Sequence, residues 1–413
     1  MVIRPKIRNN ICLNAHPTGC LEQVRDQIAA VRAGGRFPGP GAALIIGASN
    51  GYGLASRIAA AFGCGAGTVG VSYERPPAES RTASAGWYND AAFIREAEAA
   101  GLTASGINGD AFSDDVKGRA CELVRDELGS VDLVVYSIAS PRRMDPATGT
   151  LHSSVIKPIG RSYTAKTLDF QSGEVSSITA EPATADEIAD TVKVMGGDDW
   201  RLWIEALLAA GVLSGGVKTI AYSYLGPAIT YPIYRDGTIG EAKKDLERTA
   251  GGLGSLLRKR LGGEAVVSVN KALVTRASAV IPAVPLYISL LYRVMKERGL
   301  HEGCIEQMDR LFRDRLYPAA ARLGNAGVGV TAGEDRGADT GSEQRDGAGR
   351  IRMDDREMCG DVQREVEDLW ETVETENVER MTDIEGFREE FLRHHGFGMP
   401  GVDYSRDVDP LSV

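Results

Sequence analysis

The stretch ALIIGASNGYGLASRIAAAF, residues 43–62, decides the class of fold. It opens with ALIIG, a short apolar run typical of a buried parallel strand. Glycines follow at positions 47, 51 and 53, and Leu54–Phe62 has the composition of a helix. Glycines at such a place permit a tight turn and let backbone N–H groups approach a pyrophosphate, which the positive end of the helix dipole attracts. The stretch therefore predicts a dinucleotide-binding turn.

The spacing of these glycines, Gly-x3-Gly-x-Gly, differs from the commoner Gly-x-Gly-x2-Gly and points to the short-chain reductase variant. A second apolar run, Thr68–Glu74, ends in an acidic residue 21 positions after Gly53. An acid near this offset accepts hydrogen bonds from the adenosine ribose and repels a 2′-phosphate. Glu74 therefore favours NADH over NADPH, although Arg75 follows it directly.

Strand-like and helix-like segments continue to alternate along the chain. Further strands are expected at 104–110, 131–140, 217–224 and 265–273, and further helices at 90–100, 114–128, 199–210, 241–261, 287–298, 303–316 and 361–380. Alternation at this spacing is typical of βαβ units. We therefore expect an α/β fold with a Rossmann-like, doubly wound parallel sheet of the short-chain-reductase type, an enlarged substrate-binding cap and C-terminal helices.

The length of 413 residues exceeds the about 250–300 at which one hydrophobic core usually stops growing, so the length predicts one enlarged α/β domain or two closely fused lobes. Of these we expect a single enlarged α/β domain over 1–413. Its expected segments are the first half of the dinucleotide-binding sheet at 42–140, a cap at 141–216, the catalytic strand, helix and substrate-binding segment at 217–320, a flexible glycine-rich insertion at 324–350 and a C-terminal helical tail at 351–413. The apolar stretch Ile281–Leu291 is either plain core or the lining of an acyl tunnel.

Composition disfavours several classes of protein. Lys and Arg number 47 against 57 Asp and Glu, a net charge of −10, which disfavours nucleic acid as a partner because duplex binding needs a concentrated cationic face. No apolar run matches the roughly 20 residues that a membrane span needs. The six cysteines form no CxxC pair and the five histidines form no HExxH motif, so we expect no metal site, no disulfide scaffold and a cytoplasmic location.

Two further strand ends carry candidate cofactor contacts. Asp110 and Ala111 end the third strand, where the aspartate fits either an adenine-edge contact or the opening of an ordinary turn before Ser113. Ile138 and Ala139 end the fourth strand, where small residues let a nicotinamide ribose pass. Ordinary short-chain dehydrogenases carry Asn-Asn-Ala-Gly at the latter place, so Ser-Ile-Ala-Ser favours an enoyl reductase instead.

A tyrosine and a lysine form the candidate catalytic pair. Tyr234 and Lys243 are nine residues apart, whereas short-chain dehydrogenases place the pair four apart on one helical turn. On one continuous helix nine residues at about 100° each would put them on opposite faces. Thr238 and Glu241 fit a capping box, so we expect the helix to begin between the two and let both point into one site, the ammonium favouring an ionised phenol. The alternative is a surface tyrosine and a solvated lysine.

Several motifs together resemble the FabV-type enoyl reductases, also called trans-2-enoyl-CoA reductases. Tyr-x8-Lys and GASxGYG carry the resemblance, together with INGDAFSD at 107–114, SIASPRR at 137–143, ICLNAHPTGC at 11–20, VMGGDDW at 194–200, HEGCIEQ at 301–307 and GVDY at 401–404. The resemblance covers nearly the whole chain. The glycine- and charge-rich stretch 324–349 departs from it, because it is longer than the family pattern.

The resemblance implies NADH-dependent reduction of the C2–C3 double bond of a trans-2-enoyl thioester on acyl carrier protein or coenzyme A, the last reductive step of fatty-acid chain elongation. It implies that Tyr234 is the proton donor and that Tyr224 binds the substrate carbonyl. It implies cofactor contacts by Gly47, Ala48, Ser49, Asn50, Gly51, Tyr52, Tyr73, Glu74, Asp110, Ala111, Ile138, Ala139, Lys243, Ala272, Leu273 and Val274. The x8 spacing selects Lys243 rather than Lys244, and the family implies a monomer.

Two other functions are weighed against this one. A short-chain ketone or alcohol dehydrogenase shares the cofactor fold, but Tyr-x8-Lys and the sequence of Ser137–Ser140 speak against it. A non-catalytic dinucleotide-binding sensor would have lost the chemistry, and the presence of Tyr224, Tyr234 and Lys243 disfavours that interpretation.

Overall fold

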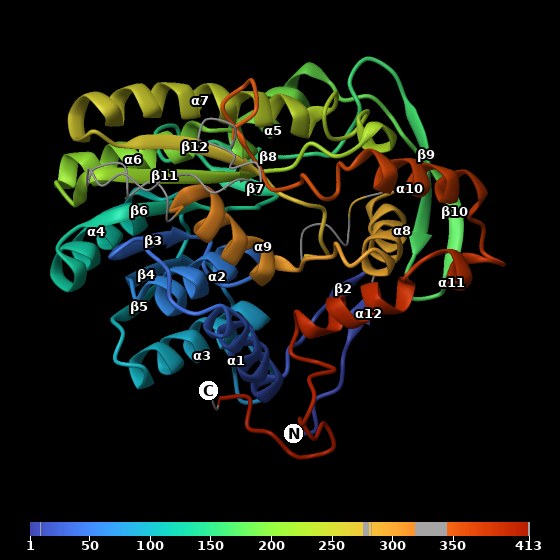
Figure 1. The fold of residues 1–413 in the computed structure, drawn as a ribbon, viewed down its shortest axis with the longest axis horizontal. Helices are drawn as coiled ribbons and strands as arrows, with labels where there is room; N and C mark the ends of the chain where they lie inside the picture. The colour runs from blue at the N-terminus through green and yellow to red at the C-terminus, as the bar shows by residue number, and fades with distance from the viewer. Residues whose placement is uncertain (9, 276–280, 282, 319–344, 412–413) are drawn as a thin grey trace, which may run out of the picture.

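A seven-stranded sheet lies at the centre of the molecule (Figure 1). The structure, a computed structural model, describes residues 1–8, 10–275, 281, 283–318 and 345–411. The strands follow the order β13-β12-β11-β6-β3-β4-β5, and every neighbouring pair runs parallel. They are β3 Ala42–Ile46, β4 Gly67–Ser72, β5 Ala104–Asn108, β6 Val131–Tyr136, β11 Leu213–Ser223, β12 Glu264–Val269 and β13 Ile351–Arg352. The predicted Rossmann-like parallel sheet is confirmed.

Helices cover both faces of this sheet. Ala43 and Ile45 belong to one buried cluster, whereas Leu44 and Ile46 belong to another on the opposite face. The first cluster is completed by α1 Pro17–Ala33, α2 Gly51–Ile58, α3 Ala85–Ala99 and α9 Cys304–Arg310, and the second by α4 Asp114–Leu128, α6 Asp198–Ala210 and α7 Thr238–Leu261. Burial on both faces explains why β3 is a continuous apolar run rather than an alternating one.

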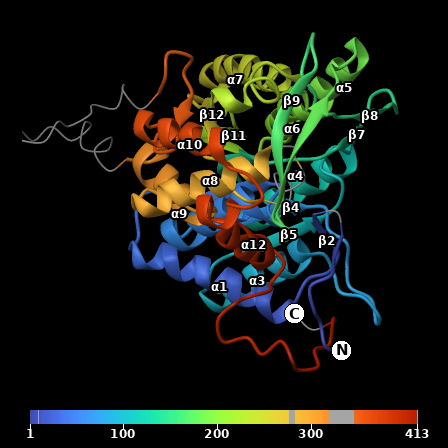
Figure 2. The same cartoon turned by 90° about the vertical axis from the view of Figure 1, so that its right-hand side faces the viewer.

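A third buried cluster includes residues that follow the carboxyl ends of β11 and β12. It joins the antiparallel hairpin β9 Tyr163–Asp169 and β10 Glu174–Ala180 to α8 Val284–Glu297, α10 Gly360–Thr372, α11 Val378–Met381 and α12 Ile384–Arg393. Strand β9 packs against α8, as Figures 1 and 2 show together. The described residues of the apolar stretch 281–291 are buried in this cluster.

Smaller elements complete the chain. Two short antiparallel pairs are β1 Ile7–Arg8 with β2 Ile11–Cys12, and β7 Arg142–Met144 with β8 Leu151–Ser153. Helix α5 Ala185–Met195 packs along α7. The region 141–216, for which the sequence predicts a cap, contains the hairpins β7–β8 and β9–β10. Helices α5 and α6 follow them before β11 begins.

Several predicted boundaries are wrong, and tertiary contacts explain the most important of them. The strand expected at 265–273 ends at Val269, because residues 270–275 leave the sheet to contact other segments. The strand expected at 131–140 ends at Tyr136. The helix expected at 361–380 is two helices, α10 and α11. The helices expected at 54–62 and 303–316 end in π-helical turns, η1 Ala59–Cys64 and η4 Leu311–Leu316.

The glycine-rich insertion expected at 324–350 lies outside the described residues up to 344. From Arg345 onward the chain is described, and the Arg345 guanidinium donates a 2.6 Å hydrogen bond to Glu264 at the start of β12.

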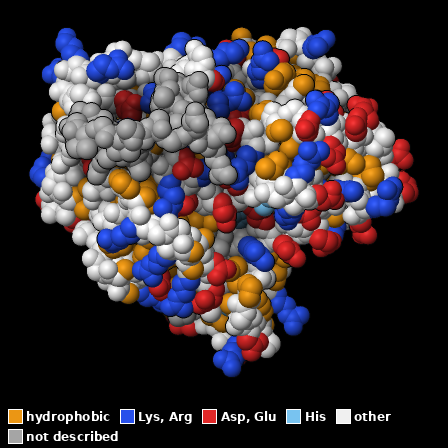
Figure 3. Space-filling view, in the orientation of Figure 1, with side chains coloured by type: hydrophobic (Ala, Val, Ile, Leu, Met, Phe, Trp, Pro, Cys, Tyr) orange, Lys and Arg blue, Asp and Glu red, His pale blue; other side chains and the backbone are white. Residues whose placement is uncertain are grey.

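The surface carries both signs of charge. On the face drawn in Figure 3, basic and acidic side chains of the described residues are interspersed. None of the helices within the described ranges combines the length and apolar character needed to cross a membrane.

Candidate active site

The order of strands in the sheet arranges the predicted cofactor residues in a row. Strands β5, β4, β3, β6 and β11 are successive neighbours, and the chain reverses its direction of travel between β3 and β6. Such a reversal opens the crevice in which parallel α/β sheets bind ligands. The predicted residues follow the carboxyl ends of these strands in the same order, namely 110–111, 73–74, 47–52, 138–139 and 224.

The glycine-rich turn occupies the middle of this row. Gly47 has a left-handed backbone (φ +90°), and a Cβ atom there would overlap the carbonyl oxygen of Ser137 at the end of β6. A Cβ atom on Gly53 would in turn overlap the carbonyl oxygen of Gly47. Only glycine lets β3, β6 and the start of α2 meet so closely. Asn50 makes no side-chain cap on α2, so the first-turn N–H groups stay available for a phosphate.

Glu74 is tied to the glycine-rich turn rather than directed into solvent. Its carboxylate is buried and accepts hydrogen bonds from Ser49 Oγ at 2.8 Å and Asn50 Nδ2 at 3.3 Å. Gly86 of α3 lies against the same carboxylate, leaving no space for a Cβ. Tyr73 is 77% exposed, so its side chain extends into solvent beside Glu74. Their assignment to the adenosine ribose stays a prediction.

Asp110 stabilises a turn after β5, which is one of the two roles that the sequence allows for it. Its Oδ1 accepts the Phe112 N–H at 3.0 Å, and its carbonyl oxygen accepts the Ser113 hydroxyl at 2.8 Å. The carbonyl oxygen of Ala111 accepts Lys117 Nζ at 3.1 Å and Trp203 Nε1 at 3.0 Å. These bonds fix the loop after β5 and are compatible with a cofactor contact by the aspartate side chain.

The two predicted tyrosines lie in contact. Tyr224 directly follows β11, and Tyr234 lies in the turn before α7, where its N–H donates to the carbonyl oxygen of Thr230. Their ring centroids are 4.9 Å apart with an interplanar angle of 87°, an edge-to-face contact. Tyr234 is buried, with 7% of its surface exposed. The alternative of a surface tyrosine is wrong.

Both phenols are held in the neutral form. Burial raises the pKa of Tyr224 and of Tyr234, and the negative charge of Glu357 raises both pKa values further. Burial and the charge of Glu357 oppose the expected effect of an ammonium on the phenols. At neutral pH each hydroxyl is a proton-bearing donor.

Lys243 reaches the same end of β11 from the second turn of α7. Its Nζ donates to the carbonyl oxygen of Tyr222 at 3.2 Å. Burial lowers the pKa of Lys243 to about 8, with Glu247 acting in the opposite direction. Lys244, by contrast, bonds Glu241 at 2.6 Å on the exposed side of the helix, as the spacing predicted.

The predicted capping box at the start of α7 is wrong. Gly237 is the N-cap residue, and Thr238 already lies inside the helix. The Thr238 hydroxyl bonds the carbonyl oxygen of Val155 at 2.5 Å and the N–H of Lys157 at 3.2 Å. Contacts with a distant segment therefore fix the start of the helix, but it still begins between Tyr234 and Lys243.

The segment Ala272–Leu273–Val274 and the preceding Lys271 are held by hydrogen bonds to three other parts of the chain. Ala272 N–H donates to Glu357 Oε2 at 2.7 Å, and Val274 N–H donates to Tyr292 Oη at 3.0 Å. Tyr52 Oη, in the first turn of α2, donates to the carbonyl oxygen of Lys271 at 2.6 Å. The segment thus lies beside the first turn of α2, and its assignment to the nicotinamide stays a prediction.

Sequence reasoning missed Glu357 and its partner Tyr287. Glu357 is fully buried and accepts hydrogen bonds from Tyr224 Oη at 3.0 Å and Tyr287 Oη at 2.7 Å. Burial raises the pKa of Glu357 to about 7. The residue sits in an irregular segment among Asp354, Asp355 and Arg356, so nothing in the local pattern sets it apart from its charged neighbours.

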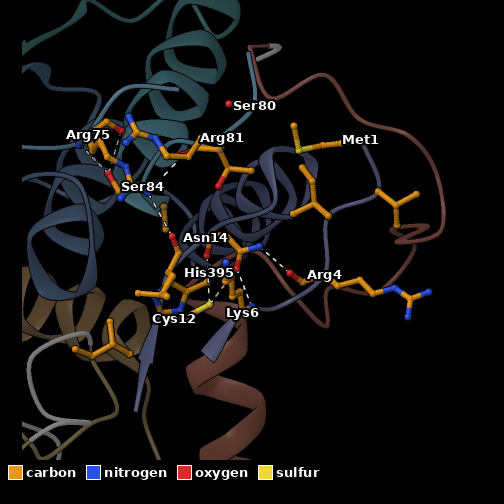
Figure 4. A pocket seen from close by; sticks show the side chains of 16 residues that line it. Met1, Arg4, Lys6, Cys12, Asn14, Arg75, Ser80, Arg81, Ser84 and His395 are labelled. Carbon is orange, nitrogen blue, oxygen red and sulfur yellow. Dashed lines mark hydrogen bonds between the residues drawn. The ribbon is translucent and has the colours of Figure 1, made fainter. Parts of the chain in front are cut away.

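A separate cavity of about 630 Å³ lies between the N-terminal segment and the loop that follows Glu74 (Figure 4). Arg4, Lys6, Arg75 and Arg81 are among its lining residues, and none of the predicted site residues lines it. Arg75 N–H donates to Ser84 Oγ at 3.0 Å, so the loop after Glu74 forms part of the wall. The cavity is therefore distinct from the catalytic end of the site.

The parallel sheet, the glycine-rich turn at its reversal point and the tyrosine pair in edge-to-face contact define a Rossmann-type, dinucleotide-dependent oxidoreductase. The chain belongs to the trans-2-enoyl-CoA reductase family. Residues 81–317 match the family model described as the trans-2-enoyl-CoA reductase catalytic region. Residues 2–79 match the NAD(P)H binding domain of trans-2-enoyl-CoA reductase, and residues 345–408 match the enoyl reductase FAD binding domain.

Relatives with known names cover the whole chain. An enoyl-[acyl-carrier-protein] reductase [NADH] of Opitutus terrae is 53% identical over 99% of this chain and 99% of its own. That of Coxiella burnetii is 54% identical over 99% and 96%. The trans-2-enoyl-CoA reductase of Treponema denticola, solved in complex with NAD, has a TM-score of 0.90 at 47% identity and covers 99% of this chain and 98% of its own. That of Clostridium acetobutulicum, solved with NADH, has a TM-score of 0.91 at 43% identity over the same shares.

The described residues of the third matched region do not resemble a dinucleotide site. They hold the two-residue strand β13 and helices α10, α11 and α12, which pack with α8. A strand followed by a glycine-rich turn and a helix, the arrangement that cradles a pyrophosphate, lies at 42–58 instead. We derive no chemical step through a flavin.

Proposed function

We propose that this chain reduces the C2–C3 double bond of trans-2-enoyl thioesters with NADH, giving saturated acyl thioesters. The observation that carries the proposal is the row of predicted residues along the sheet, which ends at the contact between Tyr224 and Tyr234. Membership of the trans-2-enoyl-CoA reductase family supports it and favours it over a ketone or alcohol dehydrogenase.

The residues present fit a nicotinamide dinucleotide. The first-turn N–H groups of α2 would hold the pyrophosphate, Glu74 the adenosine ribose, and the Ala272–Val274 segment would lie over the nicotinamide. Lys243, whose Nζ bonds the strand end before Tyr224, would donate to the cofactor. When bound, NADH supplies the hydride that adds to C3 of the substrate.

The two tyrosines would stabilise the negative charge that forms on the thioester oxygen and supply the proton for C2. Hydride addition at C3 leaves negative charge on the thioester oxygen, and Tyr224 would donate a hydrogen bond to that oxygen. One such donor is worth roughly 2.7–4 kcal/mol in the transition state. Tyr234 would supply the proton that C2 requires, a role that a neutral buried phenol can fill. Its elevated pKa keeps that proton in place until the enolate forms.

The proposal extends to the setting of the enzyme. It places the reaction at the last reductive step of fatty-acid chain elongation, in the cytoplasm, by a monomer that uses acyl carrier protein or coenzyme A as carrier. The names of the relatives support both carriers. Comparing kcat/KM for one enoyl chain on the two carriers tests which one the surface prefers.

The test of the proposed reaction is the loss of NADH absorbance with crotonyl-CoA and, separately, with acetoacetyl-CoA. Oxidation of NADH with crotonyl-CoA alone supports the enoyl reductase. Oxidation with acetoacetyl-CoA alone indicates a ketone reductase. Binding of NADH without turnover of either thioester would leave only a dinucleotide sensor.

A further inference from the structure

Glu357 joins three parts of the active site through one buried carboxyl group. Its Oε1 accepts the hydroxyls of Tyr224, after β11, and of Tyr287, on α8, at 3.0 and 2.7 Å. Its Oε2 accepts the N–H of Ala272, after β12, at 2.7 Å. The side chain is fully buried, so no solvent competes for these bonds.

Among the described residues, no cation forms an ion pair with this carboxyl group. None of the ion pairs within the described ranges includes Glu357, and the neighbouring Asp354 pairs with Arg352 at 2.7 Å. The charge of Lys271 lowers the pKa of Glu357, but Lys271 Nζ bonds the carbonyl oxygen of Ala272 at 3.0 Å and lies 4.8 Å from the Tyr292 ring centroid. A buried carboxyl group without a paired cation tends to take up a proton.

The hydrogen bonds of an ionised Glu357 conflict with the role proposed for Tyr224. A phenol carries one O–H, and an ionised carboxylate can only accept. If Glu357 is ionised, the single hydrogen of Tyr224 points at Oε1 and cannot also point at a thioester oxygen. A protonated Oε1 resolves the conflict, because it can donate to the Tyr224 oxygen and free the tyrosine hydrogen.

We propose that Glu357 acts as a positioning residue in its carboxylic acid form, donating from Oε1 to Tyr224 so that the Tyr224 hydroxyl donates to the substrate carbonyl oxygen. The proposal rests on the substrate-binding role proposed for Tyr224. The resulting chain runs from the carboxyl O–H to the phenol and then to the thioester oxygen. The carboxyl proton comes from solvent before turnover and is not consumed. Oε2 meanwhile keeps the N–H of Ala272, which joins the nicotinamide-side segment to the same group.

General chemistry supports such an arrangement. A carboxylic acid kept neutral by an apolar site can donate a hydrogen bond towards a developing oxyanion. Consecutive hydrogen bonds also polarise one another, so a proton on Oε1 makes the Tyr224 hydroxyl a better donor. With Glu357 ionised, its negative charge would instead lie behind Tyr224 and oppose charge on the substrate oxygen.

The pH dependence follows from the protonated form being the active one. Burial raises the pKa of Glu357 to about 7, while Lys271, the Tyr287 hydroxyl and the Ala272 N–H lower it and Asp354 raises it. We expect kcat to fall as the pH rises through about 7. Lys243, with a pKa lowered by burial to about 8, would weaken NADH binding and so add a second fall in rate at higher pH.

Glu357→Gln is the discriminating variant. The glutamine carbonyl can replace Oε2 and accept the Ala272 N–H, while its NH2 group replaces the protonated Oε1 and donates to Tyr224. The Gln363 side chain contacts the Tyr287 hydroxyl, and its Oε1 has no hydrogen-bond partner among the described residues. Rotation of that amide lets Oε1 accept the Tyr287 hydroxyl. We expect kcat within about threefold of wild type at about pH 6, and the fall near pH 7 to disappear while the one near pH 8 stays.

Two control variants frame this experiment. Glu365→Gln, an exposed member of α10 that pairs with Arg298, should leave kcat and its pH profile unchanged. Glu357→Leu removes both donor and acceptor, and we expect it to lower kcat about tenfold or more at every pH. Thermal denaturation of each variant, with and without NAD, separates misfolding from an effect on Tyr224.

A spectroscopic readout tests the protonation itself. The infrared band of a protonated carboxyl group should be present in the wild-type holoenzyme below about pH 7, titrate away above it, and be missing from Glu357→Gln. Loss of most activity in Glu357→Gln at every pH, or a pH profile identical to wild type, would overturn the proposal. A wild-type enzyme that turns over no enoyl thioester would overturn the proposed function first, and this inference with it.

Discussion

The glycine-rich turn and the tyrosine site both lie at the carboxyl ends of the strands of one sheet, yet they are assembled in opposite ways. Residues 42–58 form the turn within one short segment, and its key contacts are between backbone atoms. The tyrosine site draws its groups from after β11, from the turn before α7, from α7, from after β12 and from the segment before α10. The comparison teaches that the glycine-rich turn is encoded locally, whereas the tyrosine site depends on long-range packing.

Tyr234→Phe should separate the two regions most sharply. The change keeps the ring and its contact with Tyr224 but removes the proton for C2, so kcat should fall about 100-fold or more. Affinity for NADH, measured by fluorescence titration, should change less than about twofold. Retention of more than about a tenth of kcat would remove Tyr234 from the proposed role.

Gly47→Ala should have the next largest effect, on folding rather than on chemistry. A Cβ atom there meets the Ser137 carbonyl oxygen and the left-handed backbone disfavours it, so the free energy of unfolding should fall by about 2–4 kcal/mol. Denaturant unfolding measures this. The matched control is Gly118→Ala on α4, where the space is open and the backbone ordinary; it should gain about 0.5–1 kcal/mol. Equal effects at the two positions would contradict the close packing of the turn.

Lys243→Met should weaken NADH binding by about tenfold, because it removes one charged hydrogen-bond donor. The pKa of Lys243 is lowered to about 8, and the ammonium is the binding form, so wild-type affinity for NADH should fall as the pH rises through about 8. The variant should lose that dependence. Lys244→Met, which removes an exposed surface pair, is the control and should bind NADH as the wild type does. Identical behaviour of the two variants would break the assignment.

Glu74→Gln should give the smallest effect. Glutamine can still accept the hydrogen bonds of Ser49 and Asn50, but it lacks the charge that repels a 2′-phosphate. The preference for NADH over NADPH, taken as a ratio of kcat/KM values, should fall about fivefold. An unchanged ratio would show that Glu74 only supports the turn.

The sequence predicts the locally encoded elements well and those that depend on long-range contacts poorly. The strands β3, β4 and β6 and the turn after β3 were predictable because their apolar runs and glycines are contiguous. The early end of β12 was not, since residues 271 and 272 leave the sheet to bond Gln307 and Glu357, which lie 36 and 85 positions further along the chain. The capping box predicted at Thr238 fails for the same reason, because the Thr238 hydroxyl donates to the distant carbonyl oxygen of Val155 instead of capping the helix.

Family resemblance, more than sequence pattern, predicts the catalytic residues. Spacing alone left Tyr234 and Lys243 open to a surface interpretation, and nothing in the sequence connected Tyr224 to Glu357, 133 positions away. The protonation of the phenols was likewise beyond sequence reasoning, because it depends on burial that only the packed structure defines.

The contact between Tyr224 and Glu357 has a consequence for engineering. It links the second and third of the regions that the family models treat separately, and the bond from Tyr52 to the Lys271 carbonyl links the first and second. The regions are therefore not interchangeable modules. A chimera that takes one region from a relative would have to inherit matching partners in the others, so recombination at these borders should preserve the fold more readily than the catalysis.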